Sequence, residues 1–160
     1  MSSPSVDDIA SLIERAGFSQ EDRLYATREQ CGTFALALYD ELRERGIESC
    51  FMAIGTEPSW ETDTSPLPRP LPFRVPNRLK RSHFNHVAVF YNGIFFDAEG
   101  PHTKAWLAEH YSAFGAVVLD RQRLFSKMGL SDRMPLYYDQ EFYKSARSRL
   151  SRAAETQFSS

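Results

Sequence analysis

The feature that most constrains this chain is an Asn-Gly pair between two runs rich in apolar and aromatic residues. Asn92-Gly93 follows the run 84–91 and precedes the run 94–98. Such a pair between two strand-like runs is typical of a two-residue β-hairpin, because both turn positions need a positive φ. The sequence therefore predicts two antiparallel strands in one register, with Tyr91 opposite Ile94.

The hairpin register brings His86 and Asp97 to one face of the predicted sheet. A two-residue turn places Ala88 opposite Asp97, and residues two apart on a strand share a face. Asp97 is then the diagonal neighbour of His86, roughly 7–8 Å away between backbones, a gap that two side chains can close. Glu99 lies directly opposite His86 in the same register, so it is a second carboxylate placed to orient the ring.

A second constrained segment, residues 31–46, is predicted to be a helix that begins at Cys31. Its apolar residues recur at helical spacing, arginines lie in its last turn, and Gly46 follows as a C-terminal cap. A thiol at a helix N-terminus is near the positive end of the helix dipole, which favours the thiolate. The backbone N–H groups there have no partner within the helix and are available to hold an oxyanion.

Together these residues supply the groups of a nucleophilic triad. A carboxylate on one imidazole nitrogen fixes the tautomer and stabilises the imidazolium. The other nitrogen is then available to hold a proton taken from a thiol. The sequence thus predicts Cys31 as nucleophile, with His86 and Asp97 as its partners.

On these residues the chain resembles the papain-like cysteine enzyme superfamily, in particular its transglutaminase-like and small bacterial cysteine peptidase branches. The similarity covers about residues 25–100. The matching pieces, in this order, are Cys31-Gly32-Thr33-Phe34-Ala35-Leu36-Ala37-Leu38, His86-Val87-Ala88-Val89 and Asp97. The resemblance implies an α+β fold, in which a buried helix carrying Cys packs on an antiparallel sheet carrying His and Asp. It also implies that His86 is the general base and acid, and it favours Asp97 over Glu99 as the orienting group.

The sequence also departs from that superfamily. Papain-type peptidases carry an oxyanion-binding Gln several residues before the nucleophile, whereas Tyr25 lies in that region here. No Trp follows the cysteine, as it often does in transglutaminases. Gln30, directly before the nucleophile, is the candidate substitute. The further candidates for contacting substrate or oxyanion are Gly32, Asn85 and Glu99.

The remaining sequence predicts one cysteine-enzyme domain over residues 1–140 and a C-terminal helix or frayed tail over 141–160. The Pro- and Arg-rich segment 56–82 is expected to be a lid, a binding loop or a disordered stretch, and as a loop it would form one wall of the cleft. The other expected elements are helices at 5–17 and 103–111, one helical turn after Ser19, and strands at 47–54 and 116–119.

Composition limits the classes of partner. A net charge of −2 gives no general attraction to nucleic acid, which is the least favoured partner. No apolar run is long enough to span a bilayer, and the first residues do not form a secretory signal. With only two cysteines, the expected location is the cytoplasm, or delivery by a specialised secretion route without a signal. Neither a metal nor an organic cofactor is expected, and the oligomeric state is left open.

Each candidate residue also has a purely structural interpretation. Cys31 could be a small buried apolar side chain, His86 a hydrogen-bonded core histidine and Asp97 a turn cap. His102 and His110 are expected on the surface.

The leading hypothesis is a cysteine-dependent hydrolase or acyltransferase that acts on a peptide bond or a glutamine side chain through a thioester. Its partner would be a protein or peptide substrate, and peptidase, deamidase and transglutaminase chemistry all stay open. The alternative is an inactive domain of the same fold that binds a protein. A third hypothesis is nucleic-acid binding by the basic segment 69–81.

Overall fold

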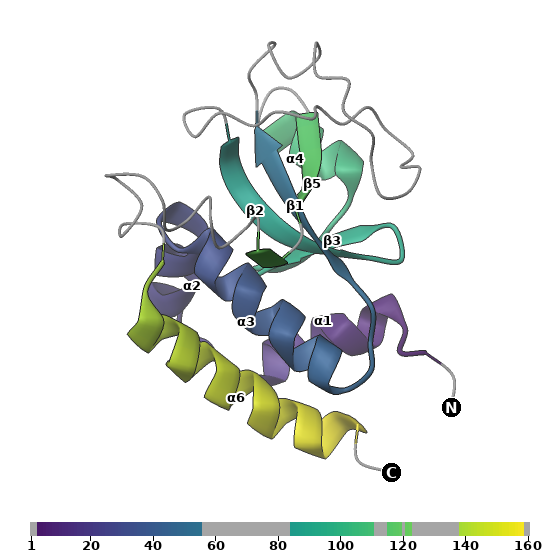
Figure 1. The fold of residues 1–160 in the computed structure, drawn as a ribbon, viewed down its shortest axis with the longest axis vertical. Helices are drawn as coiled ribbons and strands as arrows, with labels where there is room; N and C mark the ends of the chain where they lie inside the picture. The colour runs from purple at the N-terminus through teal and green to yellow at the C-terminus, as the bar shows by residue number, and fades with distance from the viewer. Residues whose placement is uncertain (1–2, 56–83, 111–114, 120, 123–137, 159–160) are drawn as a thin grey trace.

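The structure, a computed structural model, describes residues 3–55, 84–110, 115–119, 121–122 and 138–158 of the 160. The expectations for segment 56–82 lie outside these residues. Within them the chain has an α+β fold, in which helices pack against one antiparallel sheet (Figure 1).

The sheet has five strands in the order β4-β3-β2-β1-β5, and every neighbouring pair is antiparallel. The strands are β1 (Cys50–Gly55), β2 (Phe84–Tyr91), β3 (Ile94–Asp97), β4 (Gly100–His102) and β5 (Gly115–Leu119). The two longest strands, β1 and β2, are adjacent near the middle of the sheet, and the short β4 forms one edge.

The predicted hairpin is confirmed in position and in register. Asn92 and Gly93 have φ values of 48° and 82°, the positive values that a two-residue turn of this kind requires. Tyr91 pairs with Ile94, and the next pair along the ladder forms as predicted. The Asn-Gly pair therefore determines which residues of β2 and β3 lie opposite each other.

Helix α3 (Cys31–Glu44) is the most deeply buried helix, and ten of its 14 residues are buried. It contacts β1, β2 and β3 on one side and α2 (Gln20–Arg28) and α6 (Gln140–Phe158) on the other. Figure 1 shows α3 lying between the sheet and α6. Its cysteine end is thereby held against the sheet.

The end of α3 explains why β1 begins later than predicted. Gly46 adopts a φ of 76°, and the N–H of Ile47 bonds back to the carbonyl of Leu42 at 2.9 Å. This is the hydrogen-bonding pattern of a helix C-terminal cap. Residues 47–49 therefore belong to the exit from the helix, and the strand starts at Cys50.

The two N-terminal helices begin with capping boxes. In α1 (Val6–Arg15) the Ser5 hydroxyl accepts the N–H of Asp8, and the Asp8 carboxylate accepts the N–H of Ser5. Ser19 and Asp22 repeat the arrangement at the start of α2. The single turn predicted after Ser19 is in fact a helix of nine residues.

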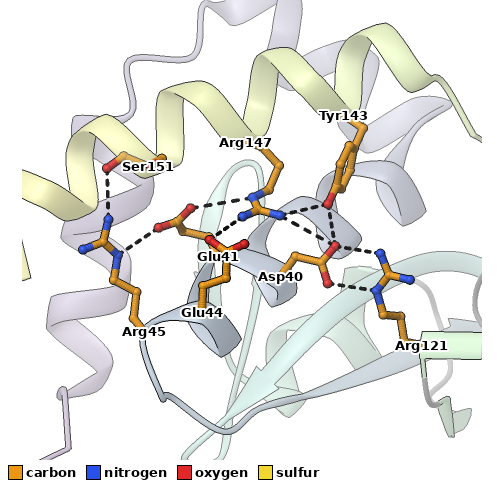
Figure 2. Close-up of polar contacts among 8 residues, drawn as sticks. All are labelled: Asp40, Glu41, Glu44, Arg45, Arg121, Tyr143, Arg147 and Ser151. Carbon is orange, nitrogen blue, oxygen red and sulfur yellow. Dashed lines mark hydrogen bonds and ion pairs between the residues drawn. The ribbon is translucent and has the colours of Figure 1, made fainter.

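The C-terminal helix α6 is part of the core. It buries one stripe of small and apolar side chains against α3 and α1 (Ala146, Leu150, Ala153 and Ala154). A set of polar and charged side chains also joins α6 to α3, and we call this set the α3–α6 cluster (Figure 2). The α3–α6 cluster contains Asp40, Glu41, Glu44, Arg45, Arg121, Tyr143 and Arg147.

The other face of the sheet has a smaller group of buried side chains. Met52, Ala88, Phe95 and Leu107 are at most 1% exposed but lie outside the cluster around α3. Leu107 comes from α4 (Lys104–His110), which follows β4 at one edge of the sheet and precedes β5 at the other. In Figure 1, α4 lies behind the strands. None of the helices in the described ranges has the length and apolar character that crossing a membrane requires.

Candidate active site

Cys31 is the first residue of α3 and is partly exposed. Gln30 is the N-cap, and its carbonyl accepts the N–H of Phe34 at 3.0 Å. The N–H groups of the first helical turn lie at the same end of the helix as the thiol. The first turn of α3 contains no acidic residue. This end of the helix therefore presents a thiol among hydrogen-bond donors.

His86 lies on β2 and is 1% exposed. Its Nε2 is 2.8 Å from Oδ2 of Asp97, which is the last residue of β3. An ionised carboxylate only accepts hydrogen bonds, so Nε2 is the donor. The proximity of these two residues, predicted from the hairpin register, is confirmed.

Cys31 lies close enough to His86 to act on the charge of its ring. Burial disfavours the charged ring, but the hydrogen bond to Asp97 and the interaction with Cys31 outweigh burial and raise the pKa of His86 to about 10. The ring is therefore an imidazolium at neutral pH. A thiol beside an imidazolium is the arrangement that favours a reactive thiolate.

Asp97 accepts three hydrogen bonds. Its Oδ2 faces His86, while its Oδ1 accepts the N–H of Glu99 at 2.8 Å and Nε2 of His102 at 2.9 Å. Burial alone would raise the pKa of Asp97, but the hydrogen bonds from His102 and His86 hold it well below its usual range. The carboxylate is therefore ionised although it is only 5% exposed.

The alternative in which Glu99 orients His86 is wrong. That prediction extended the paired strand through residue 99, whereas β3 ends at Asp97 and the chain turns before Gly100, which has a φ of 109°. Glu99 is exposed, and its carboxylate lies 4.0 Å from Arg23. The turn moves this side chain out of the register that would have placed it opposite His86.

The prediction that His102 lies on the surface is also wrong. Its side chain is 10% exposed and is bonded to Asp97, whereas His110 is exposed as expected. Strand β4 pairs with β3 so that His102 lies opposite Phe95. The sequence held a signal for this return, because Gly100 three residues after Asp97 is typical of a tight turn.

The remaining candidates for binding an oxyanion are Gln30, Gly32 and Asn85. Gln30 is 3% exposed, and its side-chain carbonyl accepts the hydroxyl of Thr33 at 2.7 Å. Gly32 is buried in the first turn of α3. Asn85 lies in β2 where the register with β1 shifts, between one residue paired with Ile54 and another paired with Gly55.

Two further residues of interest are Tyr25 and Cys50. Tyr25, in the region of the missing Gln, donates its hydroxyl to Asp139 at 2.6 Å. This hydrogen bond and burial raise the pKa of Tyr25 to about 12. Cys50 is half-buried at the start of β1.

The imidazoles near Asp97 are not arranged as metal ligands. His86 and His102 each direct Nε2 to a different oxygen of the carboxylate. Across the described ranges, no three His, Cys, Asp or Glu side chains are grouped to hold a metal ion.

Comparisons of the chain with protein-family models, with curated proteins and with solved structures find no match. The function of the site must therefore be argued from its own geometry.

Proposed function

We propose that this protein is a cysteine-dependent hydrolase or acyltransferase that acts on an amide through a thioester. The observation that carries the proposal is the contact between a thiol at a helix N-terminus and a buried imidazole held by a carboxylate. These are the parts that a Cys-His-Asp triad needs. A papain-like fold, with a buried helix and an antiparallel sheet, is the finer classification that we propose with it.

The proposed reaction begins with attack of the Cys31 thiolate on the amide carbonyl carbon. The His86 imidazolium gives its proton to the leaving nitrogen, so ammonia or an amine departs and a thioester remains. His86 then takes a proton from water or from a second amine as that nucleophile attacks the thioester. The acyl product leaves, and the thiolate and imidazolium are restored.

The transition states of both steps place negative charge on the carbonyl oxygen. The N–H groups of the first turn of α3 are candidate donors for this charge, because helix geometry leaves them without partners inside the helix. The amide of Gln30 is a further candidate. Asp97 takes no proton in this scheme, since its role is to hold the ring and to stabilise its charged form.

The decisive experiment is alkylation of the native protein by iodoacetamide at pH 6, followed by mass spectrometry of both cysteine-containing peptides. Cys50 serves as an internal control, because it is also half-buried but lies at the start of a strand. We expect Cys31 to react at least about tenfold faster than Cys50, and this advantage to disappear in His86→Ala. Equal alkylation rates for the two thiols would contradict the proposal.

The class of substrate is tested next with the wild-type protein. A panel of proteins and glutamine-containing peptides is incubated with it and examined by mass spectrometry. Cleaved peptides would identify a peptidase. Conversion of glutamine to glutamate would identify a deamidase, and a new glutamine-amine link would identify a transglutaminase.

One observation favours the second candidate, an inactive protein-binding domain. Tyr25 is bonded to Asp139, and the side-chain carbonyl of Gln30 is bonded to Thr33, so both residues near the usual oxyanion position have internal partners. This candidate predicts that Cys31 is no more reactive than Cys50 at pH 6.

A further inference from the structure

We propose that His102 is a positioning residue of the Cys31–His86–Asp97 site, which holds the Asp97 carboxylate in the one orientation that serves His86. The catalytic part of this role rests on the proposed function. The contact itself does not depend on that function, and it can be tested separately.

The hydrogen bonds to Asp97 divide cleanly between its two oxygens. Oδ1 accepts both the N–H of Glu99 and Nε2 of His102, at 2.8 and 2.9 Å. Oδ2 is bonded to Nε2 of His86 at 2.8 Å. Rotation of the carboxylate about its bond to the chain would break the bonds at Oδ1. His102 and the turn therefore keep Oδ2 pointed at His86.

This orientation decides which nitrogen of His86 faces the thiol. Because Nε2 is used by Asp97, Nδ1 is the ring nitrogen left to face Cys31. A carboxylate that turned away would release the ring from this arrangement. His102 thus acts on Cys31 only through Asp97 and His86.

His102 is itself held by a stack of three rings. Its ring lies 4.0 Å from the Trp106 ring at an interplanar angle of 10°, and Trp106 is stacked at 4.6 Å and 10° on His110. Trp106 and His110 are four positions apart on α4, the spacing that aligns side chains along a helix, and His102 is the last residue of β4 just before that helix. The stack fixes the plane of His102, and with it the direction of Nε2.

The stack is anchored by the start of α4. Thr103 caps this helix by accepting the N–H of Trp106 on its hydroxyl at 3.0 Å and the N–H of Leu107 on its carbonyl at 3.1 Å. Leu107 is fully buried, whereas Trp106 is 42% exposed. An exposed indole stacked against two imidazoles contributes little to the core. Its most direct use is to hold the neighbouring ring.

The test compares two substitutions of the same residue. His102→Phe keeps a flat ring for the stack but removes the donor to Asp97. His102→Gln offers an amide N–H in place of Nε2. Glu109→Gln, an exposed change on α4, is the matched control.

The first measurement follows the Asp97 carboxyl carbon by NMR as the pH is lowered. Loss of a hydrogen-bond donor to a carboxylate raises its pKa, so His102→Phe should raise the titration midpoint by about one unit or more. His102→Gln and Glu109→Gln should stay closer to wild type than His102→Phe. An unchanged midpoint in His102→Phe would overturn the positioning role.

The second measurement is the rate of Cys31 alkylation at pH 6. We expect a fall of about tenfold in His102→Phe, partial rescue in His102→Gln and no change in the control. A rate in His102→Phe within twofold of wild type would also count against the role. If wild-type Cys31 is itself inert, the proposed function fails, and the carboxyl titration alone then decides whether His102 holds Asp97.

Discussion

Helix α3 carries a buried polar cluster at each end, and the two clusters differ in their chemistry. At its N-terminus Cys31 lies beside His86, which is bonded to Asp97, while its C-terminal half contributes acidic residues to the α3–α6 cluster (Figure 2). Burial does not distinguish them. His86 and Asp97 are 1% and 5% exposed, and Asp40 and Glu41 are 8% and 1% exposed.

The α3–α6 cluster pairs acidic residues of α3 with arginines, beside the hydroxyl of Tyr143. Arg147 lies 2.8 Å from Glu44 and 3.6 Å from Glu41, and its guanidinium receives further support from Tyr143 at 2.9 Å. Burial works against its charge, but the hydrogen bonds to Glu44 and Tyr143 raise the pKa of Arg147 further above the physiological range. The cluster therefore joins two helices through ion pairs and hydrogen bonds of arginine.

The N-terminal cluster places a titratable ring between a thiol and a carboxylate. The difference between the two ends shows that buried charge is not by itself a sign of chemistry. A functional site is indicated when burial and charge act on a group that can gain or lose a proton beside a reactive atom.

The largest expected effect is on turnover, at the N-terminal end. Replacing Cys31 by Ser should lower turnover by about 10⁴-fold or more, because the covalent step needs the thiolate. The melting temperature should shift by only a few degrees, since the side chain is partly exposed. Product release from a substrate found in the panel, measured with thermal unfolding, provides the check. Substantial turnover by this variant would show that the thiol is not the nucleophile.

At the C-terminal end of α3 the expected effect is on stability and not on the reactivity of Cys31. Arg147→Met should destabilise the fold by about 2 kcal/mol, because it leaves the buried Glu41 with fewer partners. The loss is smaller than for a fully buried pair, since the Arg147 side chain is 21% exposed and Glu41 also pairs with Arg45.

Urea unfolding measures this loss, and Lys144→Met on the exposed side of α6 is the control, with an expected change below about 0.5 kcal/mol. The alkylation rate of Cys31 in the folded Arg147→Met variant should be unchanged. A reduced rate would mean that the two ends of α3 are coupled.

A third test separates the two clusters by pH. The pKa of His86 is raised from 6.5 to about 10 in the folded state. Its contribution to stability is therefore fully present below pH 6.5 and is lost as the pH rises through about 10.

Unfolding free energies measured over this range should show a wild-type advantage over His86→Phe that falls toward high pH. The Arg147→Met variant should keep the wild-type slope. A flat difference between wild type and His86→Phe would contradict the charged imidazole.

The smallest effect is expected for Tyr25→Phe. Loss of the hydrogen bond to Asp139 should cost about 1 kcal/mol in urea unfolding, because a single bond to a charged acceptor is removed. The alkylation rate of Cys31 should stay within twofold of wild type. A large fall in that rate would show that Tyr25 contributes to the reactivity of Cys31.

Local sequence signals predicted those parts of the fold that depend on neighbouring residues. The hairpin register follows from Asn92-Gly93, and the helix expected at 5–17 forms as α1 (Val6–Arg15). The proximity of His86 and Asp97 followed from the same register. Each is decided within a dozen residues, where backbone geometry leaves few alternatives.

Glu99 and His102, whose positions are predicted wrongly, both follow the end of β3. Glu99 lies opposite His86 only if β3 extends two residues beyond Asp97, and His102 is expected on the surface only if β4 is absent. Pairing of β4 with β3 is what buries His102 against Asp97. An edge strand of three residues leaves too weak a pattern in the sequence to be recognised alone.

The sequence by itself determined the hairpin, the helix that begins with Cys31 and the face shared by His86 and Asp97, because these follow from turn geometry and side-chain periodicity. Only the tertiary structure decided that the end of α3 meets His86, that Asp97 has a second imidazole and that α6 completes the core. Those contacts join segments whose relative positions are selected by packing of the whole chain, and no local pattern encodes them.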